Sequence, residues 1–274
     1  MADPIGWFEA VVLGLIQGLT EFLPISSSAH VLIVSKIFGW GDPGAAFTAV
    51  IQIGTEAAVI VYFRKDLLRI LSAWFRSLRT RKGTFDSRLG WYIIIGTVPI
   101  VVLGVSFTRQ IETAARNLWL VSSVLILFGL VLGFADRYGM KMRSLSGITP
   151  RDGVILGFGQ ALALIPGVSR SGATITTALA LGYTREAAAR YSFLLAIPAV
   201  LGAGFYEASK IGTASSVAWG PTLTATTISF LVGYAVITWL LRYISTHSFL
   251  PFVIYRVVLG SAVLVLLTLG VVSS

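Results

Sequence analysis

Residues 17–30 concentrate side chains that could activate a nucleophile. Ser27 and His30 are spaced i, i+3, so their side chains can meet on a helix, and a serine hydroxyl beside an imidazole is an activated nucleophile. Serines at a helix N-terminus also suit a phosphate. The alternative is that the serines only cap a helix while His30 bonds a backbone carbonyl. The carboxylate of Glu21, one helical turn after Gln17, favours the chemical interpretation.

A second segment, residues 166–174 (PGVSRSGAT), carries groups suited to an anion. Its glycines permit a tight turn, and its serines and backbone N–H groups offer donors at the start of the next helix. Arg170 adds a permanently charged planar fork that matches phosphate oxygens. The structural alternative is an arginine that only pairs with Glu21 or Glu56.

The composition indicates that lipid surrounds the elements that carry these groups. Only 12% of the 274 residues are charged, against about 25% in soluble domains, and the mean hydropathy is +0.84. The net charge of +9 comes from residues placed between apolar runs, which predicts membrane orientation rather than nucleic-acid binding. The absence of cysteine excludes disulfides and thiolate chemistry.

Six apolar segments are long enough to span a bilayer, which takes about 20 residues. They are residues 46–63, 89–107, 117–135, 191–206, 217–241 and 249–272. Two further segments, 8–38 and 153–181, are interrupted at the two polar motifs, so each half is too short to span. We therefore predict an all-α polytopic membrane protein with six transmembrane helices and two re-entrant helix pairs.

The basic segments set the predicted topology. Residues 64–88 carry eight basic side chains and form the main predicted cytoplasmic loop. Both termini then lie outside, and the two broken segments enter from opposite sides. With one gap, residues 14–27 match residues 157–169, which suggests an inverted repeat within a single domain of residues 1–274. The repeats comprise about 1–135 and 150–272, and their breaks meet near the bilayer midplane.

Other buried charges and missing motifs narrow the chemistry. Glu56 and Arg256 are interpreted as a structural ion pair, and Tyr255 as an interface or packing aromatic. Glycine-rich nucleotide loops, His-Glu-x-x-His and Gly-x-Ser-x-Gly are absent from the sequence. So is the three-part signature of the lipid-phosphatase and acid-phosphatase superfamily.

Residues 17–30 (QGLTEFLPISSSAH) and 166–174 closely resemble the two signatures of the bacterial undecaprenyl-diphosphatase family of the bacitracin-resistance type. The similarity extends to residues 51–54, 191–198 and 251–256, and so covers nearly the whole chain. The resemblance implies removal of one phosphate from undecaprenyl diphosphate, which recycles the carrier lipid for peptidoglycan synthesis. It also implies the bacterial plasma membrane, a site opening to the outer face, and a divalent cation, Mg²⁺ with Ca²⁺ as the alternative.

The resemblance assigns roles to individual positions. Ser27 would be the nucleophile or a phosphate ligand beside His30, Glu21 a base or metal ligand, and Arg170 the phosphate clamp. Gln17 is a candidate metal or phosphate ligand, but it cannot act as a base, and this weakens a two-carboxylate metal scheme. The other positions expected to bind substrate are Ser26, Ser28, Ser169, Ser171, Gly172 and Thr174.

A function of another class is also consistent with the pattern. Inverted repeats and broken helices are common in transporters, so a transporter or lipid-carrier flippase could bind an anionic headgroup at Arg170 without cleaving it. The sequence does not choose between a phosphoserine intermediate and direct attack by water. It also leaves a homodimer open.

Overall fold

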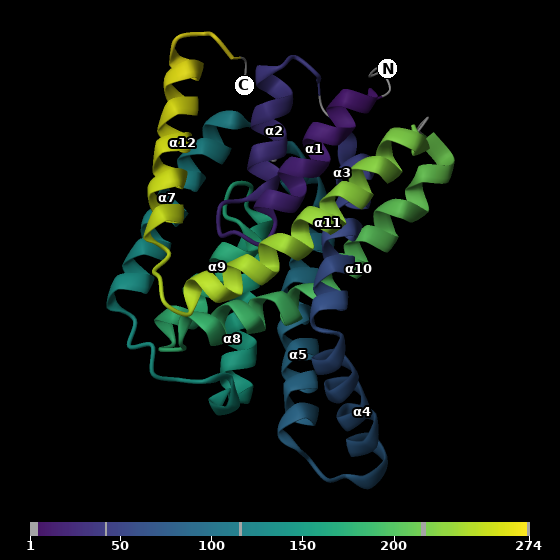
Figure 1. Ribbon diagram of the computed structural model, residues 1–274, viewed down its shortest axis with the longest axis vertical. Helices are drawn as coiled ribbons and strands as arrows, with labels where there is room; N and C mark the ends of the chain where they lie inside the picture. The colour runs from purple at the N-terminus through teal and green to yellow at the C-terminus, as the bar shows by residue number, and fades with distance from the viewer. Residues whose placement is uncertain (1–4, 42, 115–116, 215–217, 273–274) are drawn as a thin grey trace.

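A computed structural model describes residues 5–41, 43–114, 117–214 and 218–272, and these ranges are helical throughout apart from their connections (Figure 1). Five helices are long and apolar enough to cross a bilayer, or six when one bent pair counts as a single span. This confirms the polytopic membrane class. Residue 217 of one predicted span and the ends of the predicted domain, 1–4 and 273–274, lie outside the described ranges. The five helices are α5 (Phe85–Ser106), α7 (Leu118–Tyr138), α10 (Arg185–Ala214), α11 (Trp219–Ile244) and α12 (Leu250–Thr268).

The bent pair consists of α3 (Gly44–Tyr62) and α4 (Arg64–Thr80), which meet at an angle of 77°. The predicted loop over residues 64–88 is therefore mostly helical. Helix α4 packs through Ile70 and Trp74 against Gly90 of α5. An ion pair also joins Arg69 to Asp86 at the start of α5. Apolar residues recur in α4 at helical spacing and face α5, which stabilises the helix. The many basic residues of the same segment are typical of a loop, and they led to that prediction.

The two interrupted segments form short helix pairs with breaks at the predicted motifs. Helix α1 (Trp7–Thr20) leads through a turn at Pro24 into α2 (Ser27–Ile37). Helix α8 (Pro150–Ala161) leads through a short 3₁₀ turn, η2 (Leu162–Leu164), into α9 (Arg170–Ala180). Proline cannot donate a backbone hydrogen bond and disfavours helix at the preceding residue, so Pro24 and Pro166 hold both breaks open. The remaining elements are α6 (Thr108–Ala114) and η1 (Leu145–Gly147).

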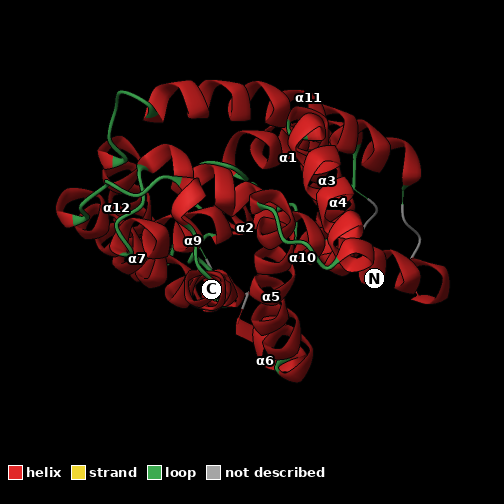
Figure 2. Cartoon of the chain, turned by 90° about the horizontal axis from the view of Figure 1, so that it is seen from below, coloured by secondary structure: helices red, strands yellow, loops and turns green. Residues whose placement is uncertain are grey.

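Close helix packing holds the two broken pairs in place. Helix α1 lies along α11 and α8 lies along α5, and Figure 2 shows α11 crossing one side of the molecule beside α1 and α3. A Cβ atom at Gly14 would lie 2.6 Å from the Ala225 carbonyl oxygen, and one at Gly157 would lie 2.6 Å from the Gly96 carbonyl oxygen. Only glycine allows both contacts, so each broken pair is fixed by the same device.

Candidate active site

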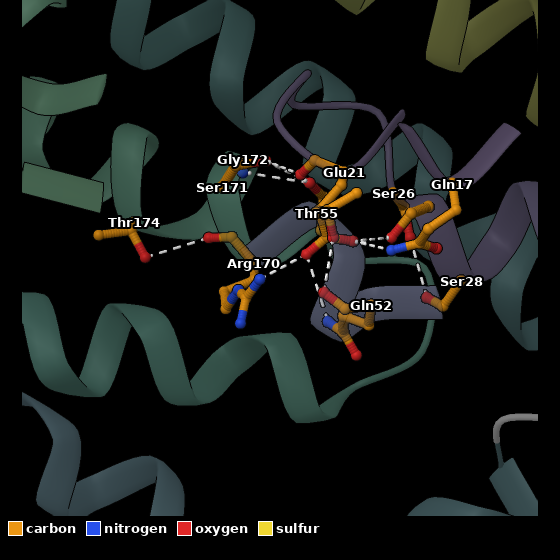
Figure 3. A network of polar contacts seen from close by, with 12 residues as sticks. Gln17, Glu21, Ser26, Ser28, Gln52, Thr55, Arg170, Ser171, Gly172 and Thr174 are labelled. Carbon is orange, nitrogen blue, oxygen red and sulfur yellow. Dashed lines mark hydrogen bonds and ion pairs between the residues drawn. The ribbon is translucent and has the colours of Figure 1, made fainter. Parts of the chain in front are cut away.

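The Glu21 carboxylate is the centre of a hydrogen-bonded network that joins both breaks (Figure 3). Glu21 follows the last residue of α1, and its side chain is 4% exposed. Oε2 accepts hydrogen bonds from Ser27 Oγ at 2.5 Å and from Gln17 Nε2 at 2.8 Å. Oε1 accepts from Gln52 Nε2 at 3.2 Å and forms an ion pair with Arg170. One carboxylate thus contacts the candidate nucleophile and the candidate phosphate clamp.

The second break contacts the first through two side chains. Arg170, the first residue of α9, pairs with Glu21, and Ser171 Oγ donates to the Leu23 carbonyl oxygen at 3.1 Å. The structure therefore brings Ser27 and Arg170 to one carboxylate, as the sequence predicts. The alternative in which Arg170 pairs with Glu21 also holds. An arginine has five N–H donors, and the ion pair with Glu21 uses only the Nη2 atom of Arg170. The remaining donors of the guanidinium can therefore bind a phosphate while the ion pair is kept.

His30 bonds a backbone carbonyl, as the alternative interpretation of the sequence expects, and does not contact Ser27. Its Nδ1 atom lies 2.7 Å from the Ser26 carbonyl oxygen, and its Nε2 atom lies 2.8 Å from the Tyr255 hydroxyl. A carbonyl only accepts, so Nδ1 donates, and in the neutral ring Nε2 accepts from Tyr255. Both ring nitrogens are engaged, and the predicted Ser27–His30 dyad is wrong. The i, i+3 spacing allows that contact, but Ser27 turns toward Glu21 instead.

The serines that begin the two helices adopt the same unusual backbone conformation. Ser26 has φ of 74° and Ser169 has φ of 73°, a region that non-glycine residues enter at a cost of about 1–3 kcal/mol. Ser26 lies nine positions after Gln17, and Ser169 lies nine positions after Gln160. Ser26 therefore matches Ser169 in spacing and backbone conformation, whereas the gapped match suggested by the sequence pairs Ser27 with Ser169.

The other predicted positions surround these turns. Ser26 Oγ lies 3.3 Å from Ser28 Oγ, and Ser169 Oγ accepts from Gly172 N at 3.1 Å. The hydroxyl of Thr174 donates to the Arg170 carbonyl oxygen at 3.0 Å, so in this arrangement it supports the helix. The N-termini of α2 and α9 both lie at this network, because their first residues, Ser27 and Arg170, contact Glu21. Helix N-termini supply unpaired N–H groups and positive potential, which favour an anion.

Arg256 connects the two breaks through hydrogen bonds to backbone carbonyl oxygens. It is completely buried, and its Nε, Nη1 and Nη2 atoms each lie 3.0 Å from a backbone carbonyl oxygen, those of Leu125, Pro24 and Gly167 respectively. The predicted ion pair with Glu56 is therefore wrong in the described part of the chain. The structural role predicted for Arg256 is correct, and the sequence did not identify the carbonyl oxygens that it binds.

Gln52 and Tyr255 are two contacts of the network that sequence reasoning missed. Gln52 reaches Glu21 from α3, and Tyr255 reaches His30 from α12. An uncharged amide inside an apolar span is a signal for Gln52, because buried polar groups in membranes need partners. Tyr255 lies among many aromatic residues in apolar helices, and nothing in its local sequence separates it from packing or interface aromatics.

These contacts define a class of protein: a polytopic membrane protein in which two broken helix pairs build a serine–carboxylate–guanidinium site. Residues 10–262 match the family described as "Bacitracin resistance protein BacA". The chain is 58% identical to the undecaprenyl-diphosphatase of a Nocardioides species over 98% of this chain and all of the relative. It is also 58% identical to undecaprenyl-diphosphatase 2 of Agrobacterium fabrum, over 98% of this chain and 99% of that one. The chain belongs to the BacA family.

Proposed function

We propose that this membrane enzyme hydrolyses undecaprenyl diphosphate to undecaprenyl phosphate and inorganic phosphate. The reaction recycles the carrier lipid for peptidoglycan synthesis and confers resistance to bacitracin. The observation that carries the proposal is the Glu21 carboxylate, which accepts the Ser27 hydroxyl and pairs with Arg170 at the same time. A nucleophile, its base and an anion-binding fork thus meet on one side chain. The transporter alternative has no observation in its favour.

The geometry supports Ser27 as nucleophile with Glu21 as its base. As Ser27 Oγ attacks the terminal phosphorus, its proton passes to Glu21 Oε2 over the 2.5 Å hydrogen bond. The bond between that phosphorus and the bridging oxygen breaks, and undecaprenyl phosphate leaves with this oxygen. Water then hydrolyses the phosphoserine and releases phosphate. His30 acts as a positioning residue, because it holds the Ser26 carbonyl that precedes the nucleophile.

Charge stabilisation is the main contribution of the second break. Arg170 and the N-termini of α2 and α9 face the phosphoryl oxygens, on which negative charge spreads in the transition state. Fixed donors in a water-poor site stabilise such charge strongly, by about 2.7–4 kcal/mol for a single well-placed donor. Ser169 and Ser171 hold the loop that presents Arg170.

The residues of the site also fit a divalent cation, Mg²⁺ with Ca²⁺ as the alternative. Carboxylate and amide oxygens are the hard ligands that these ions take, and Glu21, Gln17 and Gln52 supply them. Among the described residues, no three carboxylate, imidazole or thiol side chains lie close enough together to hold a metal ion by themselves. Diphosphate oxygens and water would therefore complete the coordination, as is usual for Mg²⁺. When bound, the cation would neutralise charge on the phosphoryl oxygens.

The arrangement of the two halves supports six spans, an inverted repeat and a site that opens to the outer face. Gly14 and Gly157 make equivalent close contacts in α1 and α8, and Ser26 and Ser169 begin equivalent helices. With the basic connections in the cytoplasm, α6 and the start of α7 lie at the outer side. This topology places both termini outside, as predicted from the sequence. A dimer is not required by the site.

An apolar cavity offers a place for the prenyl tail. It has a volume of about 580 Å³ and lies between α5, α6, the start of α7 and the second break. Its lining includes Phe107, Leu120, Ala161 and Pro166, and Pro166 lies four residues before Arg170. With the diphosphate at Glu21 and Arg170, the first isoprene units would lie against this wall. The remainder of the tail would stay in the outer leaflet.

The decisive measurement is phosphate release from undecaprenyl diphosphate by the purified, detergent-solubilised protein, with and without a chelator. Wild type should release phosphate, and Ser27→Ala should not. Rapid-quench experiments should trap a phosphoserine at Ser27. Turnover retained by Ser27→Ala, with no phosphoenzyme, would favour water activated by Glu21. Tight binding of the substrate without any phosphate release would instead favour the transporter.

A further inference from the structure

Helix α3 carries a buried carboxyl group, that of Glu56. Glu56 is 1% exposed, and its Oε1 atom has no hydrogen-bond partner among the described residues. Removing a carboxylate from water costs several kcal/mol unless a partner compensates it. Ionisable residues inside membrane helices are therefore functional candidates whose partners must be found. The mechanism above leaves Glu56 without a role.

The position of Glu56 directs it toward the candidate active site. Residues four positions apart share a helix face, and Gln52, four positions earlier, donates to Glu21 Oε1 at 3.2 Å. Figure 3 shows Gln52 beside Glu21 and Arg170. Arg170 and Glu21 are also the charged groups that interact electrostatically with the Glu56 carboxyl group. Glu56 therefore lies next to the network without forming a hydrogen bond within it.

The charges of Glu21, Glu56 and Arg170 indicate which kind of partner Glu56 would take. With all three side chains ionised, Glu21 and Glu56 contribute −2 and Arg170 contributes +1. A diphosphate brings further negative charge, and one guanidinium cannot neutralise both the carboxylates and the substrate. Arg256 directs three of its nitrogens to carbonyl oxygens. A divalent cation supplies two positive charges and takes carboxylate oxygens as ligands.

We propose that Glu56 and Glu21 together bind the divalent cation, with Glu56 as the second carboxylate ligand. This inference rests on the proposed function. Gln17, which occupies the expected metal position in the first signature, has an amide in place of a carboxylate, and a cation held by Glu21 alone would be weakly bound. Glu56 supplies the second carboxylate from a neighbouring helix. Gln52, one turn before it, links the two carboxylates through its bond to Glu21.

Binding of Mn²⁺ to the full-length, detergent-solubilised protein tests the proposal without substrate. Free Mn²⁺ is measured by electron paramagnetic resonance for wild type, Glu56→Gln and Glu56→Asp. Glu9→Gln is the matched control, because Glu9 accepts only an exposed bond from Gly6 N. We expect Glu56→Gln to raise the Kd for Mn²⁺ at least tenfold, Glu56→Asp to retain most of the affinity, and Glu9→Gln to bind like wild type.

Two outcomes would overturn the proposal. One is a Glu56→Gln variant that binds Mn²⁺ within twofold of wild type. The other is a Glu56→Asp variant that binds as weakly as Glu56→Gln, since a structural role then explains both losses. Phosphate release by wild type is measured separately. Its absence would refute the proposed function, while a Mn²⁺ site lost with Glu56 would still stand.

Discussion

Replacing Arg256 by lysine tests how the two breaks are held together. The arginine forms three hydrogen bonds of 3.0 Å from a fully buried guanidinium to the carbonyl oxygens of Leu125, Pro24 and Gly167. Hydrogen bonds from a charged group contribute about 1.5–3 kcal/mol each. Lysine has a single nitrogen and cannot reproduce the planar fork. We expect it to lose two of the three bonds and to destabilise the protein by about 3–6 kcal/mol.

The same substitution should lower activity, because Pro24 precedes Ser27 and Gly167 precedes Arg170. A displacement of about 1 Å between reacting groups can lower a rate about 100-fold. Unfolding in detergent is followed by intrinsic fluorescence as an apparent midpoint, and turnover by phosphate release. Arg242→Lys, at an exposed position near the end of α11, is the control and should match wild type. An Arg256→Lys variant with wild-type midpoint and turnover would refute this reasoning.

Three further predictions address the phosphate site, the ion pair of Arg143 with Asp152 and the tail cavity. Arg170→Lys should lower kcat/KM for phosphate release about 100-fold or more, because a point charge replaces the fork; an unchanged value would remove Arg170 from the phosphate site. Burial raises the pKa of Asp152, but hydrogen bonds from Arg143 and two hydroxyls outweigh it and lower the pKa to about 2. This stabilisation is present above the unfolded pKa near 4 and is lost as the pH falls toward 2. Asp152→Asn should therefore destabilise the protein by about 1–2 kcal/mol at pH 7. The difference in unfolding midpoint between wild type and Asp152→Asn should shrink at pH 3, and an equal difference at both pH values would contradict this prediction. Ala161→Trp should raise the KM for undecaprenyl diphosphate more than that for farnesyl diphosphate, with Ala203→Trp as control; equal effects on both substrates would count against the cavity.

Long apolar segments separated by basic clusters made the all-helical, polytopic membrane class predictable from the sequence. Spans of about 20 apolar residues have few alternatives in a bilayer. The polar motifs that contain Pro24 and Pro166 favour a break inside such a segment, whereas Pro99 and Pro198, without neighbouring serine–glycine motifs, lie inside continuous helices. Arg170 near Glu21 was also predictable, because isolated charges in the membrane require partners. The segment that forms α4 was predicted as part of a cytoplasmic loop because of its many basic residues, although its apolar residues also recur at helical spacing.

The directions of side chains at the breaks were not predictable. Sequence spacing allowed Ser27 to meet either His30 or Glu21, and the choice depends on the positive φ of Ser26, which no propensity for serine would suggest. Arg256 and Glu56 looked like a pair because both are ionisable and buried. The guanidinium instead binds the carbonyl oxygens of Pro24 and Gly167, which lie in the two breaks, and that of Leu125 in α7. These features depend on three-dimensional neighbours from distant segments.

The position of Arg256 between the two breaks has a consequence for the movement of lipid across the membrane. Alternating access requires one half of a carrier to rock against the other around its cargo. Here a single guanidinium is bonded to a loop from each half and to α7. Rocking would have to rupture these bonds in the dry interior, so we expect the two halves to stay joined during turnover. A headgroup that binds between the breaks should then leave on the side from which it entered.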